Sequence, residues 1–296
     1  MCGRERPRGN AARASGLEVA ELERVIGAAL DEDLRYGPDV TSEATIPAAR
    51  TTRAAVVARQ RGVLCGNVAA LAVLDAVGFP LDGASAVRRD GAPIGPGDAV
   101  LDLDGPARPL LLAERTMLNL MTHLSGIATA TDRWVRALAG TACEVRDTRK
   151  TTPGLRQLEK YAVRCGGGTN HRLGLGDAAL LKDNHIEAAG GIARAVAAIR
   201  REHPEMALEV ECDTLDQVRE ALDAGCALIL LDNMDLDAIA AAVEVIRRVP
   251  GVLVEASGSM TLERARSVAQ TGVDYIAVGS LTHSVTALDL GLDVIP

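Results

Sequence analysis

The sequence predicts an α/β protein, in which a small α/β domain is followed by repeated βα units that build a parallel barrel. Three observations support this fold class. Beyond residue 140, short apolar runs alternate with amphipathic helices. From Glu211 onward the ends of these runs recur every 21 to 24 residues, the length of a βα unit with short loops. Polar residues follow the ends of the runs, as they do at the C-terminal rim of a barrel.

The N-terminal part of the chain contains a different mixture of elements. Apolar residues at helical spacing predict helices, and short β-like runs beside turn residues predict strands. In chain order these are a helix at 17–30, a turn at 35–39, a strand at 53–59, a helix at 68–77, a strand at 99–103 and a long helix near 110–139.

Six apolar runs form the predicted barrel strands, which leaves an eight-stranded barrel incomplete. Their composition is typical of parallel strands that are buried on both faces. They lie at 143–146, 178–181, 207–210, 227–231, 252–254 and 275–278. Thr214 and Gln217 predict a capping box for a helix that ends before Gly225. Asp235 and Thr261 are the predicted N-caps of the next two helices.

The composition argues against several classes of protein. Aromatic residues make up only 2% of the 296 residues and the pI is near 5.2, so nucleic-acid binding is not expected. Six cysteines without a CxxC pair indicate reduced thiols in a cytoplasmic protein. The apolar runs are too short to cross a membrane. Residues 1–15 are expected to form a disordered, basic tail and not a signal peptide.

The three lysines of the chain are clustered. Lys150, Lys160 and Lys182 fall within 33 consecutive positions, whereas the 29 arginines are scattered. The segment 147–185 contains seven cations and four carboxylates, although the whole chain has a net charge of −8. Lysine supplies a compact charge with three rotatable donors, which suits phosphate oxygens. The cluster therefore predicts a positive pocket for a small, highly anionic ligand.

Two polar loops could bind such an anion. Thr148, Arg149 and Lys150 follow the first barrel strand, and an adjacent arginine and lysine can grip a carboxylate or a phosphate. His171 and Arg172 follow three glycines that would let a ligand approach the backbone closely. A solvated charged turn and a mobile loop are the alternative interpretations of these segments.

Charged residues also follow three later strands. Lys182 is interpreted as a site residue, with an ion pair to Asp183 as the alternative. Glu211 and Asp232 could hold ribose hydroxyls or a hydrated Mg²⁺, which prefers oxygen ligands. Glu209 is expected to point the opposite way, which makes it the weaker candidate.

Two turns of small residues follow the last two strands and resemble a phosphate cup, in which backbone N–H groups bind the anion. They consist of Ser257, Gly258 and Ser259 in one case and of Gly279 and Ser280 in the other. Arg115, beside Glu114 on the long helix, has no local reason to bind a ligand, and an exposed ion pair is its default interpretation.

Several longer motifs surround these candidates. They are Glu114-Arg115-Thr116, Ser125-Gly126-Ile127-Ala128-Thr129, Asp147 to Gly154, Glu159-Lys160-Tyr161-Ala162-Val163, Gly167-Gly168, His171-Arg172 and Lys182-Asp183-Asn184-His185. Together they resemble quinolinate phosphoribosyltransferase, over nearly the whole chain. The resemblance implies that quinolinate reacts with phosphoribosyl pyrophosphate in the presence of Mg²⁺. The implied products are nicotinate mononucleotide, pyrophosphate and CO₂, in de novo NAD biosynthesis.

The resemblance also implies roles for the candidate residues. The cations expected around the carboxylates of quinolinate are Arg149, His171, Arg172 and Lys182, and those expected to reach the pyrophosphate are Lys150 and Lys182. Glu211 and Asp232 would hold the ribose hydroxyls and Mg²⁺. The turns at 257–259 and 279–280 would bind the 5′-phosphate. Arg115 would enter from the other subunit of a homodimer, with a higher oligomer left open.

The implied fold is an α/β sandwich of residues 16–125 with the C-terminal tail 286–296, followed by an incomplete α/β barrel of residues 126–285. Ser259 departs from the family, which commonly has a second glycine there. The nearest alternative is a same-fold paralogue associated with molybdenum transport that acts on a different acceptor. A non-catalytic anion-binding regulator is the second alternative, and it would not need Glu211 and Asp232 together.

Overall fold

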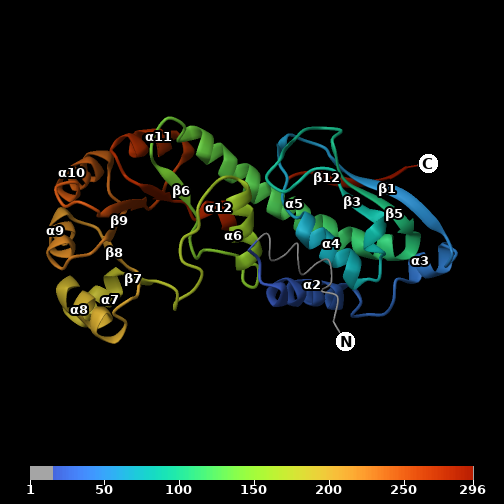
Figure 1. Ribbon diagram of the computed structural model, residues 1–296, viewed down its shortest axis with the longest axis horizontal. Helices are drawn as coiled ribbons and strands as arrows, with labels where there is room; N and C mark the ends of the chain where they lie inside the picture. Colours follow the sequence, from blue (N-terminus) through green and yellow to red (C-terminus); the bar gives the residue numbers. More distant parts are fainter. Residues whose placement is uncertain (1–15, 296) are drawn as a thin grey trace. The chain divides into compact units, whose positions relative to one another are not determined.

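The computed structural model describes residues 16–295, so the tail predicted at 1–15 lies outside the described residues. The chain divides into two compact units (Figure 1). Among the described residues, one consists of 16–132, 151–167 and 281–295, and the other of 133–150 and 168–280.

A four-stranded antiparallel sheet organises the first unit. Its order is β12-β1-β5-β3. The strands are β1 (Thr51–Ala58), β3 (Ala84–Ala86), β5 (Ala99–Pro106) and β12 (Leu290–Ile295), while β2 (Gly62–Val63) pairs separately with β4 (Pro93–Ile94). Because β12 pairs with β1, the C-terminal end of the chain completes the N-terminal sheet.

Helices flank the strands of the first unit along the sequence. They are α2 (Val19–Asp33), α3 (Val40–Thr45), α4 (Asn67–Ala76), the 3₁₀ helix η1 (Leu81–Gly83) and α6 (Arg156–Cys165). The long helix α5 (Ala107–Ala137) runs from the first unit into the second, and α12 (Ser280–His283) begins where the second unit ends. The predicted helices at 17–30, 68–77 and 110–139 are confirmed, whereas α3 and α6 were not predicted.

The second unit contains a parallel sheet of six strands in the order β6-β11-β10-β9-β8-β7. The strands are β6 (Glu144–Arg146), β7 (Ala179–Leu181), β8 (Leu208–Cys212), β9 (Leu228–Asp232), β10 (Leu253–Ser257) and β11 (Tyr275–Ala277). The helices are α7 (Asp183–Ala189), α8 (Ile192–Glu202), α9 (Leu215–Asp223), α10 (Leu236–Ile246) and α11 (Leu262–Gln270). All six predicted strands are confirmed, and α8 to α11 lie on the outer side of the strands (Figure 1).

Local signals in the sequence explain where several of these helices begin and end. The Thr214 side chain accepts from the Gln217 backbone N–H, and the reciprocal contact completes the predicted capping box. Asp235 caps α10 by accepting from the Ala238 N–H at 2.8 Å. Thr261 occupies the predicted N-cap of α11, although within the described residues its side chain makes no capping hydrogen bond.

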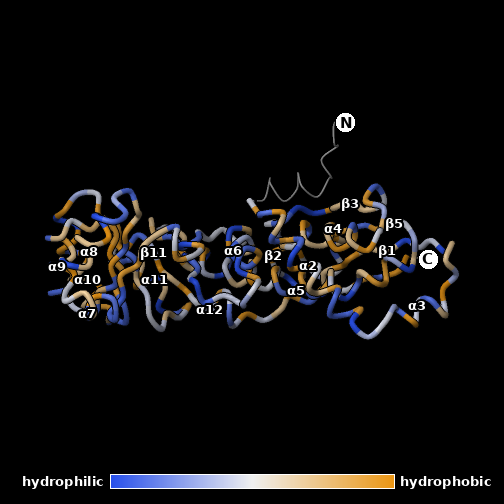
Figure 2. Tube along the Cα trace, turned by 90° about the horizontal axis from the view of Figure 1, so that it is seen from below, coloured by the Kyte–Doolittle hydropathy of each residue, from blue (hydrophilic) through white to orange (hydrophobic). Residues whose placement is uncertain are grey.

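The core of the second unit lies along the inner strands of the sheet. Val210, Ile229, Val254 and Ile276 are fully buried, one from each of four adjacent strands. Hydrophobic and hydrophilic stretches alternate along the trace (Figure 2), as expected for strands that alternate with surface helices. In the described part of the chain, even the longest helix is too rich in polar residues to span a bilayer.

Candidate active site

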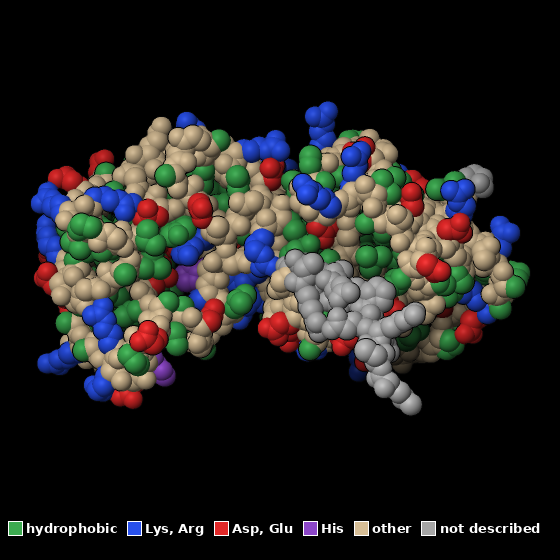
Figure 3. Space-filling model, in the orientation of Figure 1, with side chains coloured by type: hydrophobic (Ala, Val, Ile, Leu, Met, Phe, Trp, Pro, Cys, Tyr) green, Lys and Arg blue, Asp and Glu red, His purple; other side chains and the backbone are tan. Residues whose placement is uncertain are grey.

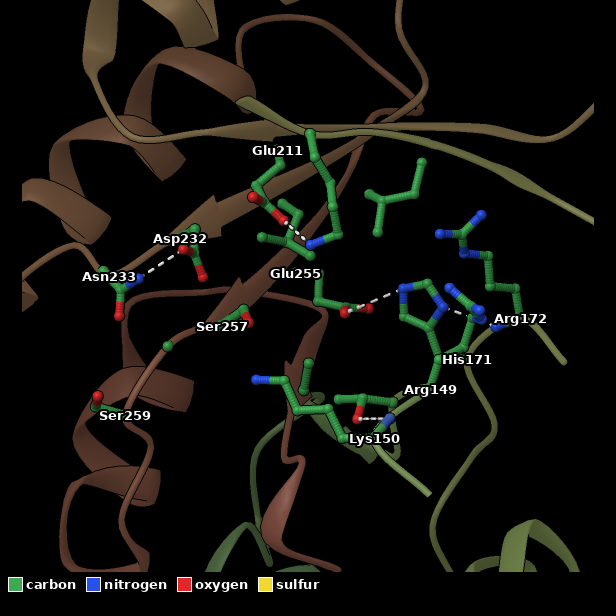
Figure 4. Close-up of a pocket in the computed structure, with 16 residues that line it drawn as sticks. Arg149, Lys150, His171, Arg172, Glu211, Asp232, Asn233, Glu255, Ser257 and Ser259 are labelled. Atoms are coloured by element: carbon green, nitrogen blue, oxygen red, sulfur yellow. Dashed lines mark hydrogen bonds and ion pairs between the residues drawn. The ribbon is translucent and has the colours of Figure 1, made fainter. Parts of the chain in front are cut away.

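A pocket of about 480 Å³ opens at the C-terminal ends of the parallel strands, and every residue that lines it belongs to the second unit. Figure 4 shows these side chains converging from separate loops and strand ends. The lining residues are Thr148, Arg149, Lys150, His171, Arg172, Leu180, Lys182, Glu211, Leu230, Asp232, Asn233, Glu255, Ser257, Gly258, Ser259 and Ala277. The cations predicted to converge are therefore side by side in the fold.

Three predicted site residues do not line this pocket. Gly279 and Ser280 follow β11, and Ser280 begins α12. Arg115 lies on α5 in the first unit, where its side chain is 67% exposed and 3.5 Å from the Glu114 carboxylate. That contact corresponds to the exposed ion pair that local sequence predicts.

The lysine cluster divides between the two units. Lys150 and Lys182 line the pocket, but Lys160 is fully buried on α6 in the first unit. Lys160, which was not among the predicted site residues, does not line the pocket, because α6 places it in the buried interior of the first unit. Over one face of the molecule, acidic and basic side chains are intermixed (Figure 3), so the gathering of cations in the pocket is a local feature.

Internal hydrogen bonds order the two cationic loops. The Lys150 N–H donates to Thr148 Oγ1 at 3.0 Å, which tightens the turn after β6. Arg172 Nη1 donates to the Ala178 carbonyl at 3.0 Å, so the guanidinium is held at one end of its loop. Burial, and secondarily the charge of nearby Arg149, lowers the pKa of Arg172. These cations repel each other, so the loop geometry favours an anion between them.

Carboxylates form the opposite wall of the pocket. Lys182 Nζ lies 2.8 Å from Glu211 Oε2, so its ion-pair partner is Glu211 and not the predicted alternative, Asp183. Asp232 accepts from Asn233 Nδ2 at 2.6 Å. Glu211 and Asp232 end neighbouring strands β8 and β9, and both offer oxygen atoms to the same cavity. This donor set suits Mg²⁺ or sugar hydroxyls.

The turn after β10 brings backbone close to the pocket. Gly258 has a φ of +87°, and a Cβ there would meet Asn233 Oδ1 at 2.2 Å, so only glycine fits. Ser259 also has a positive φ, +32°, which is unusual for a residue with a side chain. Asn233 is a lining residue that the sequence interpretation missed. The sequence clue was its position directly after Asp232, because asparagine is a residue that tolerates a positive φ, here 53°.

Beneath the pocket, His171 contacts two buried glutamates. Its Nε2 lies 2.8 Å from Glu209 Oε2 and 3.6 Å from Glu255 Oε1. On the other side of the ring, Nδ1 accepts from the Arg172 N–H at 2.7 Å. The expectation that Glu209 points away was wrong, because alternation along β8 places positions 209 and 211 on the same face.

The comparisons with known proteins agree on one family. Models described as the quinolinate phosphoribosyl transferase N-terminal and C-terminal domains match residues 39–125 and 127–293. The chain is 53% identical over 285 residues to a nicotinate-nucleotide pyrophosphorylase (carboxylating) of Mycobacterium leprae, with 95% of this chain and 99% of that protein covered. It is 41% identical over 279 residues to a probable enzyme of the same name from Bacillus subtilis, with 93% of each covered.

Solved structures give the same result for the fold. The nicotinate-nucleotide pyrophosphorylase of Francisella tularensis superposes with a TM-score of 0.87 at 35% identity, over 94% of this chain and 98% of that one. NadC from Streptococcus pyogenes gives a TM-score of 0.87 at 37% identity, over 95% and 99% of the two chains. The fold class predicted from the sequence, an α/β domain followed by an incomplete barrel of parallel strands, is confirmed.

Proposed function

Because the chain belongs to the quinolinate phosphoribosyltransferase family, we propose that it joins quinolinate to phosphoribosyl pyrophosphate, with loss of CO₂. The products are nicotinate mononucleotide and pyrophosphate, so the protein is a pentosyltransferase of de novo NAD biosynthesis. One observation supports this function above all. Cations and carboxylates that are far apart in the sequence line a single pocket of a size suited to small, charged substrates.

The cationic wall is proposed to bind the acceptor. Arg149 and Arg172 would pair with the two carboxylates of quinolinate, and planar guanidinium groups suit such pairing. Lys150 and Lys182 would face the pyrophosphate. The carboxylate wall, Glu211 with Asp232, would hold the ribose hydroxyls and Mg²⁺. When bound there, Mg²⁺ would neutralise charge on the departing pyrophosphate.

The turn at Ser257, Gly258 and Ser259 is proposed to take the 5′-phosphate, together with Gly279 and Ser280. With both substrates held, displacement at the anomeric carbon needs alignment and fixed positive charge more than a proton-transfer residue. The chain's contribution would therefore be to orient the ring nitrogen of quinolinate toward the ribose. The same cations would balance the charge that builds up on the leaving group.

A direct assay tests this function. Purified protein is incubated with quinolinate, phosphoribosyl pyrophosphate and Mg²⁺, and nicotinate mononucleotide is measured. Product is expected, and it should disappear in Lys150→Ala. Binding of phosphoribosyl pyrophosphate without product would favour the paralogue that uses another acceptor. If phosphoribosyl pyrophosphate binds but no pyridine carboxylic acid tested is converted, the non-catalytic anion-binding regulator would be favoured.

A homodimer is proposed in which Arg115 serves the pocket of the partner subunit. Its exposure supports this proposal, since 67% of the side chain is accessible and its contact in the described part of the chain is an ion pair with the adjacent Glu114. Arg115→Ala and Lys150→Ala proteins, each inactive, should regain part of the activity when mixed, because one mixed site keeps both native residues. If subunits exchange without any recovery, the shared site is wrong.

A cytoplasmic location is also proposed. The five cysteines of the described part are free thiols, which supports it.

A further inference from the structure

Two glutamates that the mechanism does not use lie beneath the pocket. Glu209 is 4% exposed and Glu255 is fully buried, and both approach the same ring nitrogen of His171. On its other side, Glu255 Oε2 accepts from Arg146 Nη1 at 2.8 Å. Within the described residues, neither Glu209 Oε1 nor Glu255 Oε1 has a hydrogen-bond partner. Buried carboxylate oxygens without donors are rare, so this group requires an explanation.

The charges of this group do not balance. Nδ1 of His171 accepts a backbone N–H, so it carries no proton, and the single ring proton lies on Nε2. His171 is then neutral, and Arg146 is the one cation that directly contacts either glutamate in the described structure. Two ionised glutamates would leave one negative charge buried without compensation, which is costly. A single proton on the pair removes that charge.

A metal ion is the other way to balance two carboxylates. A ring nitrogen of His171 and one oxygen from each glutamate all lie within 4.8 Å of one another. However, His171 would have to coordinate through Nε2, which carries the ring proton, and Nδ1 cannot take that proton while it accepts from the Arg172 N–H at 2.7 Å. The geometry therefore favours a proton over a metal ion.

We infer that Glu255 is held protonated beneath the pocket and that, as a positioning residue with Glu209 and His171, it sets the affinity for the dicarboxylate acceptor. Glu255 lines the pocket, so its ionisation would add a negative charge beside the cationic wall. The Nε2–H of His171 is anchored on Glu209, and its Nδ1 holds the backbone of Arg172. The inference rests on the proposed function, since the acceptor is quinolinate.

The surroundings of Glu255 support the location of the proton. Burial, and secondarily the charge of Glu209, raises the pKa of Glu255 from 4.5 to about 7. Each neighbouring element contributes one charged or titratable side chain near Glu255. These are Arg146 on β6, Glu209 on β8, Tyr275 on β11 and His171 on the loop after residue 168. Its neighbour on β9 is Leu230, which does not titrate. Of the two glutamates, Glu255 is the more deeply buried.

The test compares acceptor affinity at two pH values within each protein. The KM for quinolinate is measured at pH 6.5 and pH 8.5 in the wild type, in Glu255→Gln and in Glu244→Gln. Glu244 lies on α10, and its side chain is 75% exposed, so it serves as the matched control. In the wild type and the control, KM should rise by about three- to tenfold with pH, as one more charge near the pocket would cause. In Glu255→Gln the ratio should stay close to one, because the amide cannot ionise.

An equal rise of KM in Glu255→Gln and wild type would overturn the inference. If that variant does not fold, infrared spectroscopy of the wild-type protein replaces it. The carbonyl band of a buried protonated carboxylic acid should be present at pH 6 and be lost as the pH rises above 7. Its absence at pH 6 would also overturn the inference. Failure to form nicotinate mononucleotide at either pH would count against the proposed function instead, since the infrared band does not depend on turnover.

Discussion

Replacement of Arg146 by methionine should destabilise the second unit, and the loss should depend strongly on pH. The Arg146 side chain is 18% exposed, donates to fully buried Glu255 at 2.8 Å and lies 3.8 Å from the centre of the Tyr275 ring. Methionine keeps much of the side-chain volume but removes the charge. The variant therefore isolates the interaction between the guanidinium and the Glu255 carboxylate.

The expected magnitude follows from the ionisation of Glu255. Removing one partner of a buried ion pair costs about 3–5 kcal/mol, because the remaining charge stays desolvated. At pH 6 the Glu255 carboxyl is protonated, since its pKa is about 7. The substitution then removes only a hydrogen bond to Glu255 and a cation–π contact with Tyr275. These contacts contribute about 1–3 kcal/mol. Because the folded-state pKa of Glu255 is raised to about 7, stability is lost as the pH rises through that value. The variant's Glu255 stays protonated at pH 8, so linkage limits the extra penalty at pH 8, relative to pH 6, to about 1.4 kcal/mol.

Urea denaturation at pH 6 and pH 8 measures this difference. Trp134 is the one tryptophan of the chain, it is buried, and it belongs to the second unit. Its fluorescence therefore reports the unit that contains the pair, even if the two units unfold separately. Wild type and variant are compared at each pH, so that effects of pH on other groups cancel.

A penalty that is the same at both pH values would refute this reasoning, because an uncompensated charge must respond to protonation. The double variant, Arg146→Met with Glu255→Gln, is the control. It should recover most of the loss at pH 8, since no carboxylate remains to be left unpaired. If the double variant is no more stable than Arg146→Met at pH 8, the buried charge is not the cause.

Three further changes test other parts of the fold and site. Lys182→Met should lower kcat/KM by about 10²-fold, because Glu211 loses the ammonium 2.8 Å away and the pocket loses a cation, and a loss below tenfold in steady-state kinetics would contradict its role. Ser259→Gly should increase the free energy of unfolding by about 0.5 kcal/mol and so raise the urea midpoint, because relief of the strained positive φ outweighs the added flexibility of the unfolded chain. A lower midpoint would show that the serine side chain stabilises the fold by more than its backbone strain costs. Thr214→Ala should cost about 1 kcal/mol in urea denaturation by removing the cap that accepts from Gln217, whereas Thr261→Ala, which removes no cap, should cost less.

Some of the candidate site was predictable because its signals are local. Lys182, Glu211 and Asp232 each follow an apolar run, and the ends of parallel strands must lie at one edge of a sheet. The polar residues after β6 could be assigned to the same rim for that reason. Lys160 belongs to the same cluster of lysines, but it lies on helix α6 and is fully buried. Its burial depends on packing against segments far away in the sequence.

The contacts of the two glutamates beneath the pocket could not be predicted. Glu255 directly follows the predicted run at 252–254, where it or Ser257 was a candidate for the rim, but sequence does not say which face its side chain takes. Glu209 could have been placed beside Glu211 by correct use of the two-residue alternation. Its contact with His171, 38 positions away, depends on the path of the loop that follows α6.

By itself, the sequence determined the βα order, the strand ends and the chemical types available at the rim, since these follow from periodicity, turns and caps between near neighbours. Only the tertiary structure decided which pairs form: Lys182 with Glu211, His171 with Glu209 and Arg146 with Glu255. Those pairings join residues 29 to 109 positions apart. They depend on how closely desolvated charges approach, and that distance is set by the packing of the whole sheet.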